Sequence, residues 1–207
     1  TFLTVLCASI AAYAIVRLRF PGRNFVARGM IYAYLVPQSL FKIHPDNDAL
    51  LVEILAREPR AVLVMFQSRF EPITRQFINR LSQRFAARGV ATAGRVKLLP
   101  NVGHDDYLRV NLACDVMLDS LYWSGGNTSL DAIACGLPVV TQPGAYMRGR
   151  QSAGMLTLMG LEELVVRTDE AYVDLALRLG QDTDYRTRVR ASRSRALMIG
   201  SIVRATH

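Results

Sequence analysis

Short apolar runs alternate along this chain with longer segments in which apolar residues recur at helical spacing. The runs Met30–Val36, Ala61–Phe66 and Arg95–Leu99 are short and bounded by polar or turn-forming residues, which favours buried strands. After the first run, Asp46 or Asn47 can cap a helix whose apolar residues are Leu50, Leu51, Ile54 and Leu55. The pattern therefore predicts a strand–helix–strand unit.

The same alternation continues through the rest of the chain. Pro72 is predicted at the first position of a second helix that Gly89 ends, and its apolar face consists of Ile73, Phe77, Ile78, Leu81 and Phe85. Further strands are predicted at Asp115–Asp119, Pro138–Thr141 and Leu164–Val166. Further helices are predicted at Asp105–Ala113, Ser152–Met159, Asp169–Leu179 and Thr183–Met198.

Strands that alternate with helices at this spacing indicate an α/β fold. We expect a Rossmann-like parallel sheet with helices on both faces. Ligands of such sheets bind at the carboxyl ends of the strands. Three segments follow predicted strands and should converge on that rim: Pro37–Lys42, Val102–Tyr107 and Ser124–Asp131.

The stretch Asp115–Thr141, DVMLDSLYWSGGNTSLDAIACGLPVVT, combines a strand, a glycine loop and a capped helix. The side chains of Asn127, Thr128 and Ser129 are of the type that caps a helix, and Gly136 is placed to end it. Pro138 prevents its continuation.

Free amides at the start of that helix, the helix dipole and the glycines Gly125 and Gly126 are typical of a phosphate site. Asp131 lies three residues after Thr128, so it could accept hydrogen bonds from the ribose of the same ligand. The alternative is that the glycines form an ordinary turn and that Asp131 only complements the helix dipole. A short glycine motif does not decide between the two interpretations.

The composition is that of a folded α/β protein: 51% of residues are hydrophobic and the mean hydropathy is +0.17. The net charge of +8 favours an anionic ligand, an acidic partner or a membrane surface. Basic residues are scattered singly, so no nucleic-acid partner is expected. The only lysines are Lys42 and Lys97, which fits either a need for a compact ammonium group or codon bias.

The three cysteines, Cys7, Cys114 and Cys135, lie in apolar surroundings without metal-ligand spacing. Buried, reduced thiols are expected, which suits the cytoplasm, and no metal site is expected.

Residues 1–28 form an unassigned segment that begins with the apolar run Thr1–Val16. It could be the end of a membrane helix, a buried helix of a missing domain or a badly defined start, and a truncated start is our expectation. Whether a membrane is involved stays open at this point.

Four stretches carry a resemblance to a known family: PQSLFKIHP (Pro37–Pro45), ACDVMLDS (Ala113–Ser120), GGNTSLDAIACGLPVVTQPG (Gly125–Gly144) and LMGLEELV (Leu158–Val165). In this order they resemble the carboxyl-terminal catalytic domain of the O-linked N-acetylglucosamine transferase and SPINDLY family. These are GT-B glycosyltransferases that act on protein Ser/Thr from a nucleotide sugar. The resemblance covers roughly Ile31 to Arg190. It implies that residues 29–207 are a nucleotide-sugar-binding, Rossmann-like domain with C-terminal helices, the C-terminal half of a GT-B enzyme.

The resemblance assigns Lys42 to the lysine that contacts the donor diphosphate and stabilises the leaving group. The alternative for Lys42 is an ordinary surface lysine. Gln38 or Ser39 would lie near the same phosphates, although the family's amide aligns ambiguously there. Val102 matches the backbone that contacts the uracil edge, and His104 matches a basic side chain near the ribose.

Tyr107 replaces a family histidine that stacks on the base, and its ring can still stack. Gly126, Asn127 and Thr128 match the family's His-Thr-Thr run beside Gly125, so Thr128 alone is retained there as a side-chain donor to phosphate. Asp131 aligns with the ribose-binding aspartate.

The resemblance implies a UDP-sugar as donor, no metal cofactor and a protein acceptor that missing N-terminal regions would hold. The family's first lobe, with its catalytic histidine, and its tetratricopeptide array are not found in the 207 residues. His44 is interpreted as a local structural residue and not as a substitute base. The chain is predicted to be the donor-binding half of an inverting transferase, inactive alone. The alternatives are a non-catalytic binding module and a GT-B glucosyltransferase with another donor.

Overall fold

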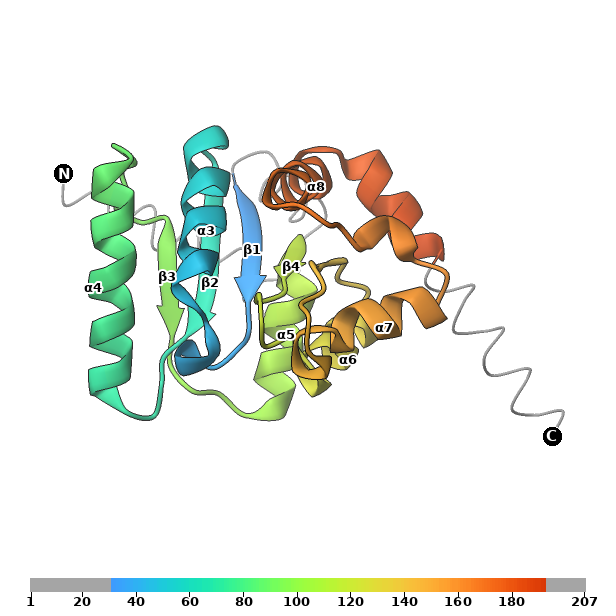
Figure 1. The fold of residues 1–207 in the computed structure, drawn as a ribbon, viewed down its shortest axis with the longest axis horizontal. Coiled ribbons are helices and arrows are strands. Elements are labelled where there is room, and N and C mark those ends of the chain that lie inside the picture. Colours follow the sequence, from blue (N-terminus) through green and yellow to red (C-terminus); the bar gives the residue numbers. More distant parts are fainter. Residues whose placement is uncertain (1–30, 193–207) are drawn as a thin grey trace, which may run out of the picture.

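The computed structural model describes residues 31–192, which form a five-stranded parallel sheet flanked by helices (Figure 1). The spatial order β3-β2-β1-β4-β5 places β1 in the middle, and every pairing is parallel. The strands are β1 (Tyr32–Val36), β2 (Ala61–Phe66), β3 (Val96–Leu99), β4 (Val116–Leu118) and β5 (Val139–Val140). The Rossmann-like sheet predicted from the alternation of strands and helices is confirmed.

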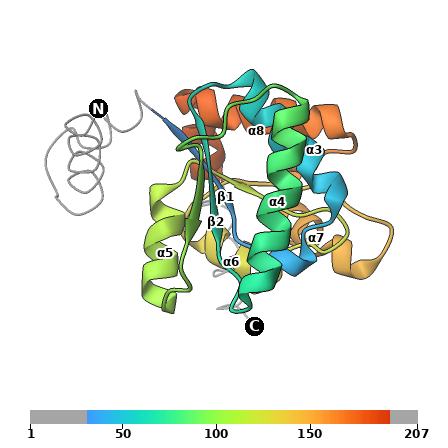
Figure 2. The same ribbon diagram turned by 90° about the vertical axis from the view of Figure 1, so that its left-hand side faces the viewer.

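Helices cover both faces of the sheet (Figure 2). Helices α3 and α4 pack together on one face, with α8 against α3, whereas α5 packs against α6 on the other. The helices are α3 (Pro45–Arg57), α4 (Glu71–Ala87), α5 (His104–Ala113), α6 (Asn127–Ala134), α7 (Gln151–Leu158) and α8 (Asp169–Gln181), followed by helical residues 183–192. Single turns of 3-10 helix occur at η1 (Leu40–Lys42), η2 (Met147–Gly149) and η3 (Glu162–Leu164).

The central strands are apolar without alternation because both of their faces are covered. Leu35, Met65 and Met117 are fully buried, one in each of three neighbouring strands. Within residues 31–192, no helix is both long enough and apolar enough to cross a membrane. Residues 1–28, for which a truncated start was expected, lie outside the described part of the chain.

The order of the strands creates a switch point beside β1. From β1 the chain builds outward through β2 to β3, then crosses back to place β4 on the other side of β1. Loops after β1 and β4 therefore leave the sheet in opposite directions, and the carboxyl ends of two such strands are where open α/β sheets bind their ligands. Two of the segments expected to converge, Pro37–Lys42 and Ser124–Asp131, begin there.

Two predicted helix caps are wrong. Neither Asp46 nor Asn47 caps α3: the cap is His44, whose Nδ1 accepts a hydrogen bond from the backbone amide of Asp46 at 3.3 Å. Imidazole replaces the usual short oxygen because Pro45 occupies the first helical position and removes one donor. The cap of α6 is Gly126, and its helix start receives no hydrogen bond from a capping side chain.

Several boundaries also differ from the prediction. The helix from Glu71 places Pro72 at its second position and not its first. Leu164–Val166 is not a regular strand: η3 ends at Leu164, and Val165 forms a single parallel bridge with Thr141. The run is too short to extend the sheet beyond one bridge. Cys114 is buried but Cys135 is only half-buried, and Cys7 lies outside the described residues.

Candidate functional site

Gln38 and Asp119 meet at the switch point of the sheet. Gln38 follows β1 and Asp119 follows β4, and the Nε2 of Gln38 donates to the Oδ1 of Asp119 at 3.2 Å. Both side chains are buried. The Oε1 of Gln38 has no hydrogen-bond partner within residues 31–192. A buried acceptor without a donor is costly, so a donor that reached this oxygen would stabilise the site.

The carboxylate of Asp119 organises the loop that follows it. Its Oδ1 accepts a hydrogen bond from the amide of Gly125 at 2.8 Å, and its Oδ2 accepts from the hydroxyls of Ser124 at 2.6 Å and Thr141 at 2.7 Å. Burial raises the pKa of Asp119 above its ordinary value, and the hydrogen bonds from Ser124, Gly125 and Thr141 oppose that rise. One buried carboxyl group therefore fixes the ends of both β4 and β5 relative to the glycine loop.

A chain of serine hydroxyls extends this network to the start of α6. The Oγ atoms of Ser124 and Ser152 lie 2.8 Å apart, and those of Ser152 and Ser129 lie 2.7 Å apart. The amide of Ser152 also donates to the Ser124 hydroxyl at 2.9 Å. Since Ser129 belongs to the first turn of α6 and Ser152 to that of α7, the hydroxyls hold both helix starts against the loop.

Gly125 lies where no side chain fits. A Cβ atom built there would be 2.3 Å from the Oγ of Ser129, 2.7 Å from the Oγ1 of Thr128 and 2.9 Å from the Nε2 of Gln38. Glycine is therefore required for the close approach of the loop to α6 and to the end of β1. At Gly126 a Cβ would meet only the Oε1 of Gln151, at 2.9 Å.

The start of α6 presents two free amides. The amide of Ser129 donates to the carbonyl of Gly126 at 3.0 Å, so Ser129 is not an open amide donor. Its side chain, predicted to be of the capping type, contacts Ser152 and does not cap the helix. Within the described range, no acceptor is found for the amides of Asn127 and Thr128 or for the Thr128 hydroxyl. Two amides and a hydroxyl at a helix N-terminus form an arrangement that suits an anion.

Lys42 lies beside the same loop. Its ammonium nitrogen is 4.9 Å from the centroid of the Trp123 ring and 5.9 Å from that of Phe41. Trp123 immediately precedes Ser124, so the η1 turn after β1 carries its positive charge to the loop after β4. Within residues 31–192, the ammonium group contacts aromatic rings and forms no ion pair with a carboxylate.

Tyr122 fixes the outer part of this loop in a left-handed backbone conformation, with φ of 64°. Its hydroxyl donates to the Oδ2 of Asp46 at 2.7 Å, and its ring meets His44 edge to face at 4.8 Å. These contacts tie the loop to the start of α3 and offset the strain of a non-glycine residue in that conformation. His44 thus has the structural role expected from the sequence.

The third predicted segment, Val102–Tyr107, leads into α5, which packs against α6. The ring of Tyr107 packs on Phe66 at the end of β2, with 5.6 Å between centroids, and stacks near His104 at 6.4 Å. Burial, with a smaller contribution from the nearby Asp131 carboxylate, raises the pKa of Tyr107 to about 12. Val102 and His104 are exposed at the rim. The charge of Asp131 thus acts on Tyr107, while the Tyr107 ring itself packs on Phe66.

Sequence reasoning missed the residues that support the site. Asp119 was identified only as the polar end of a strand, and Ser124, Ser152, Thr141 and Trp123 were assigned no role. A carboxylate directly after a buried strand at a switch point is a signal that could have indicated Asp119. The serine contacts join residues far apart in the sequence, so spacing alone gives no sign of them.

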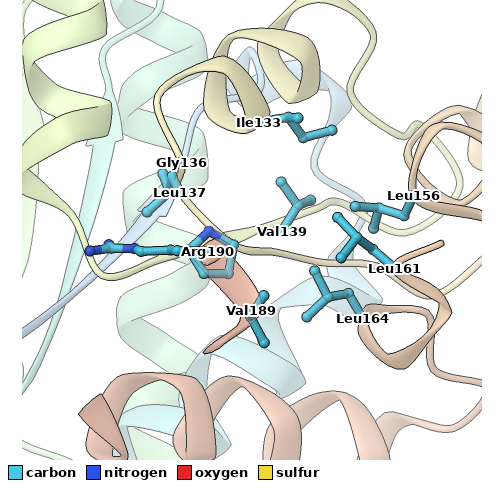
Figure 3. Close-up of a pocket in the computed structure, with 10 residues that line it drawn as sticks. Ile133, Gly136, Leu137, Val139, Leu156, Leu161, Leu164, Val189 and Arg190 are labelled. Carbon is cyan, nitrogen blue, oxygen red and sulfur yellow. The ribbon is translucent and has the colours of Figure 1, made fainter. Parts of the chain in front are cut away.

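A small apolar pocket lies elsewhere in the molecule (Figure 3). Side chains such as Ile133, Val139 and Leu164 line it, and none of the predicted site residues does. Among the described residues, no cluster of three His, Cys, Asp or Glu side chains is placed to hold a metal ion.

Comparison with known proteins decides the family. A sequence profile of glycosyl transferase family 41 matches residues 27–202. The chain belongs to this family. The chain is 31% identical over 168 residues to a probable UDP-N-acetylglucosamine–peptide N-acetylglucosaminyltransferase SPINDLY of Hordeum vulgare, covering 80% of this chain and 17% of that protein.

A second family 41 relative, a UDP-N-acetylglucosamine–peptide N-acetylglucosaminyltransferase of Caenorhabditis elegans, is 28% identical over 152 residues. That match covers 73% of this chain and 13% of the relative, so the chain spans only a small part of the length of these two proteins.

Solved structures support the assignment to family 41. A mutant O-GlcNAc transferase of Thermobaculum terrenum matches with a TM-score of 0.73 and 37% identity, over 81% of this chain and 32% of that one. The sheet and helices described above are those of the C-terminal region of a GT-B glycosyltransferase. The CMP-Kdo-binding domain of WaaA from Acinetobacter baumannii shares the fold alone, with a TM-score of 0.59 at 10% identity.

Proposed function

We propose that this family 41 chain is the donor-binding domain of an inverting transferase that moves a sugar from a UDP-sugar to protein Ser/Thr hydroxyls. The observation that carries the proposal is the rim at the switch point. There the free amides of Asn127 and Thr128 begin α6, directly after the loop whose Trp123 contacts Lys42. An anion-binding helix start and an unpaired ammonium group suit a diphosphate.

The remaining rim residues suit the rest of the nucleotide. With the diphosphate at α6, Asp131 one turn further on could accept hydrogen bonds from the ribose hydroxyls. Tyr107 and His104 offer rings beside Asp131 on which a base could stack, and the backbone at Val102 could contact its edge. Gln38 offers the buried oxygen that lacks a donor. Gly125 and Gly126 bring the backbone close to the phosphates.

In the proposed reaction an acceptor hydroxyl attacks the anomeric carbon in line. The new C–O bond forms as the bond to the β-phosphate oxygen breaks, and UDP leaves with the electron pair. Lys42 and the amides of Asn127 and Thr128 stabilise the charge that develops on the diphosphate. Preorganised donors of this kind are usually the largest contribution to catalysis. The base that takes the hydroxyl proton, and the acceptor itself, would be held by a lobe outside this chain.

N-acetylglucosamine is the proposed sugar because the relatives from Hordeum vulgare and Caenorhabditis elegans are named for that donor. The loss of two family histidines, replaced here by Gly126 and Tyr107, favours one competing function. That function is a binding module that retains the nucleotide site and has lost transfer.

Calorimetry tests the proposal directly. The folded 207-residue chain is expected to bind UDP in the micromolar to millimolar range and to turn over no UDP-N-acetylglucosamine by itself. Absence of UDP binding by protein that shows a cooperative thermal transition would contradict the assignment of the rim as a donor site. A transfer assay on the complete parent protein then separates a transferase, which labels Ser/Thr, from a binding module, which does not.

A further inference from the structure

Two positive charges converge on the ring of Trp123. The Lys42 ammonium nitrogen lies 4.9 Å from its centroid, and the guanidinium carbon of Arg148 lies 5.7 Å from the same point. Within residues 31–192, neither cation forms an ion pair with a carboxylate. The carboxylate of Asp46, which Tyr122 of the same loop contacts, accepts the hydrogen bond of the Tyr122 hydroxyl at 2.7 Å.

Arg148 is fixed to the glycine loop through its backbone. It belongs to the turn η2, and its carbonyl accepts a hydrogen bond from the amide of Ser124 at 2.8 Å. The next residue, Gly149, packs so tightly on Tyr122 that an added Cβ would lie 3.3 Å from the Tyr122 backbone. Because Ser124 precedes Gly125, the hydrogen bond places η2 against the loop that leads to the free amides of α6.

The side chain of Arg148 is oriented by two aromatic rings. Its guanidinium carbon lies 5.6 Å from the centroid of Tyr146 as well as near Trp123. The rings attract the cation without neutralising it. Two unneutralised like charges against one ring concentrate the positive potential around Trp123, which favours the binding of an anion beside this ring.

We propose that Arg148 is a second diphosphate-binding cation, which acts with Lys42 on the anion held at the start of α6. The proposal rests on the donor site described above and adds a residue to which the sequence analysis assigned no role. Lys42 supplies a compact point charge, whereas the planar guanidinium of Arg148 can donate two parallel hydrogen bonds to phosphate oxygens. The diphosphate would therefore be bound from three sides: by amides, by an ammonium group and by a guanidinium group.

Calorimetric titration of the full chain with UDP and with uridine tests this role. Arg148→Ala is expected to weaken UDP binding at least about tenfold, since a charged hydrogen bond is lost, and to leave uridine binding unchanged. Arg148→Lys should recover part of the UDP affinity, because lysine restores the positive charge but not the paired N–H donors of the guanidinium group. The matched control is Arg178→Ala. Arg178 lies in the C-terminal half of α8, and its guanidinium carbon is likewise close to an aromatic ring, 3.9 Å from the centroid of Tyr185.

The outcomes separate this inference from the proposed function. If the unmodified chain binds UDP and Arg148→Ala binds it as tightly as Arg178→Ala does, the role of Arg148 is refuted and the donor site stands. An equal loss for UDP and uridine would refute it as well, because the loop and not a phosphate contact would then have been disturbed. If the unmodified chain binds no UDP, both proposals fall.

Discussion

The backbone amide of Gly125 donates to the Oδ1 of Asp119 at 2.8 Å, which ties the glycine loop to the end of β4. The carboxylate that receives this hydrogen bond is almost completely buried, and it also accepts hydrogen bonds from Gln38, Ser124 and Thr141. The position of the free amides on α6 therefore depends on a side chain that contacts no ligand itself.

Replacing Asp119 with Asn should disturb both stability and binding. Asn has an NH2 donor in place of one of the two acceptor oxygens of Asp119. A buried hydroxyl or amide that donated to that oxygen therefore loses its hydrogen bond. We expect the free energy of unfolding to fall by about 1–3 kcal/mol, and UDP affinity to fall with it. Urea denaturation and calorimetry measure the two effects.

The control for Asp119→Asn is Asp174→Asn, which removes an exposed carboxylate paired with Arg57. A surface ion pair contributes at most about 1 kcal/mol. Equal stability of the two variants would show that the buried network does not support the loop.

The raised pKa of Asp119 makes a prediction about pH. Burial favours the protonated form of this carboxyl group in the folded protein. Its contribution to stability is therefore fully present below the unfolded pKa and is lost as pH rises through the folded pKa. The free energy of unfolding of the unmodified chain, relative to Asp119→Asn, should decrease as pH rises above the ordinary carboxyl pKa of about 4. Denaturation series at several pH values measure the slope, and a rising difference would contradict the direction.

Gly125→Ala should weaken UDP binding more than it lowers the stability of the protein. The new methyl group would overlap Ser129, Thr128 and Gln38, so the loop must move away from α6. We expect UDP affinity to fall at least about tenfold, which corresponds to 1.4 kcal/mol of binding free energy. Calorimetry with UDP gives the result.

Gly154→Ala provides the matched control for Gly125. Gly154 lies within α7, and an added Cβ meets nothing within 4 Å. Alanine there should leave UDP affinity unchanged and raise stability by up to about 1 kcal/mol, as expected for glycine replaced within a helix. A UDP affinity for Gly125→Ala equal to that of Gly154→Ala would exclude the close approach at Gly125 as a requirement for binding.

Trp123 reports on Lys42 because it is the only tryptophan of the chain. If UDP draws the ammonium group from the indole ring to the diphosphate, the emission of Trp123 should change in a saturable way during titration with UDP. Lys42→Ala should alter the starting emission and weaken UDP binding about tenfold or more. Lys97→Ala, a change in β3, serves as the control. UDP binding without any change in the emission of Trp123 would contradict the proposed contact between Lys42 and the diphosphate.

The sequence predicted the strands and helices of this molecule better than the helix caps and the residues that support the site. Apolar runs revealed the strands because both faces of the sheet are covered, and strand ends revealed the three rim segments. The caps of α3 and α6 were wrong because an imidazole and a glycine replaced the usual short polar side chains at these positions. Ser152 and Arg148 could not be found by spacing, since their partners Ser124 and Trp123 are distant in the sequence and become neighbours only in the folded protein. Asp119 could have been indicated only by its place directly after a buried strand.

The free amides of Asn127 and Thr128 also bear on how this site could diversify. Backbone groups are present whatever the residue, so mutation can alter the side chains at 126 and 127 without removing them. Gly125, by contrast, admits no replacement. Mutations at positions 126 and 127 could therefore change which sugar is accepted, while the proposed binding of pyrophosphate by the backbone amides is retained.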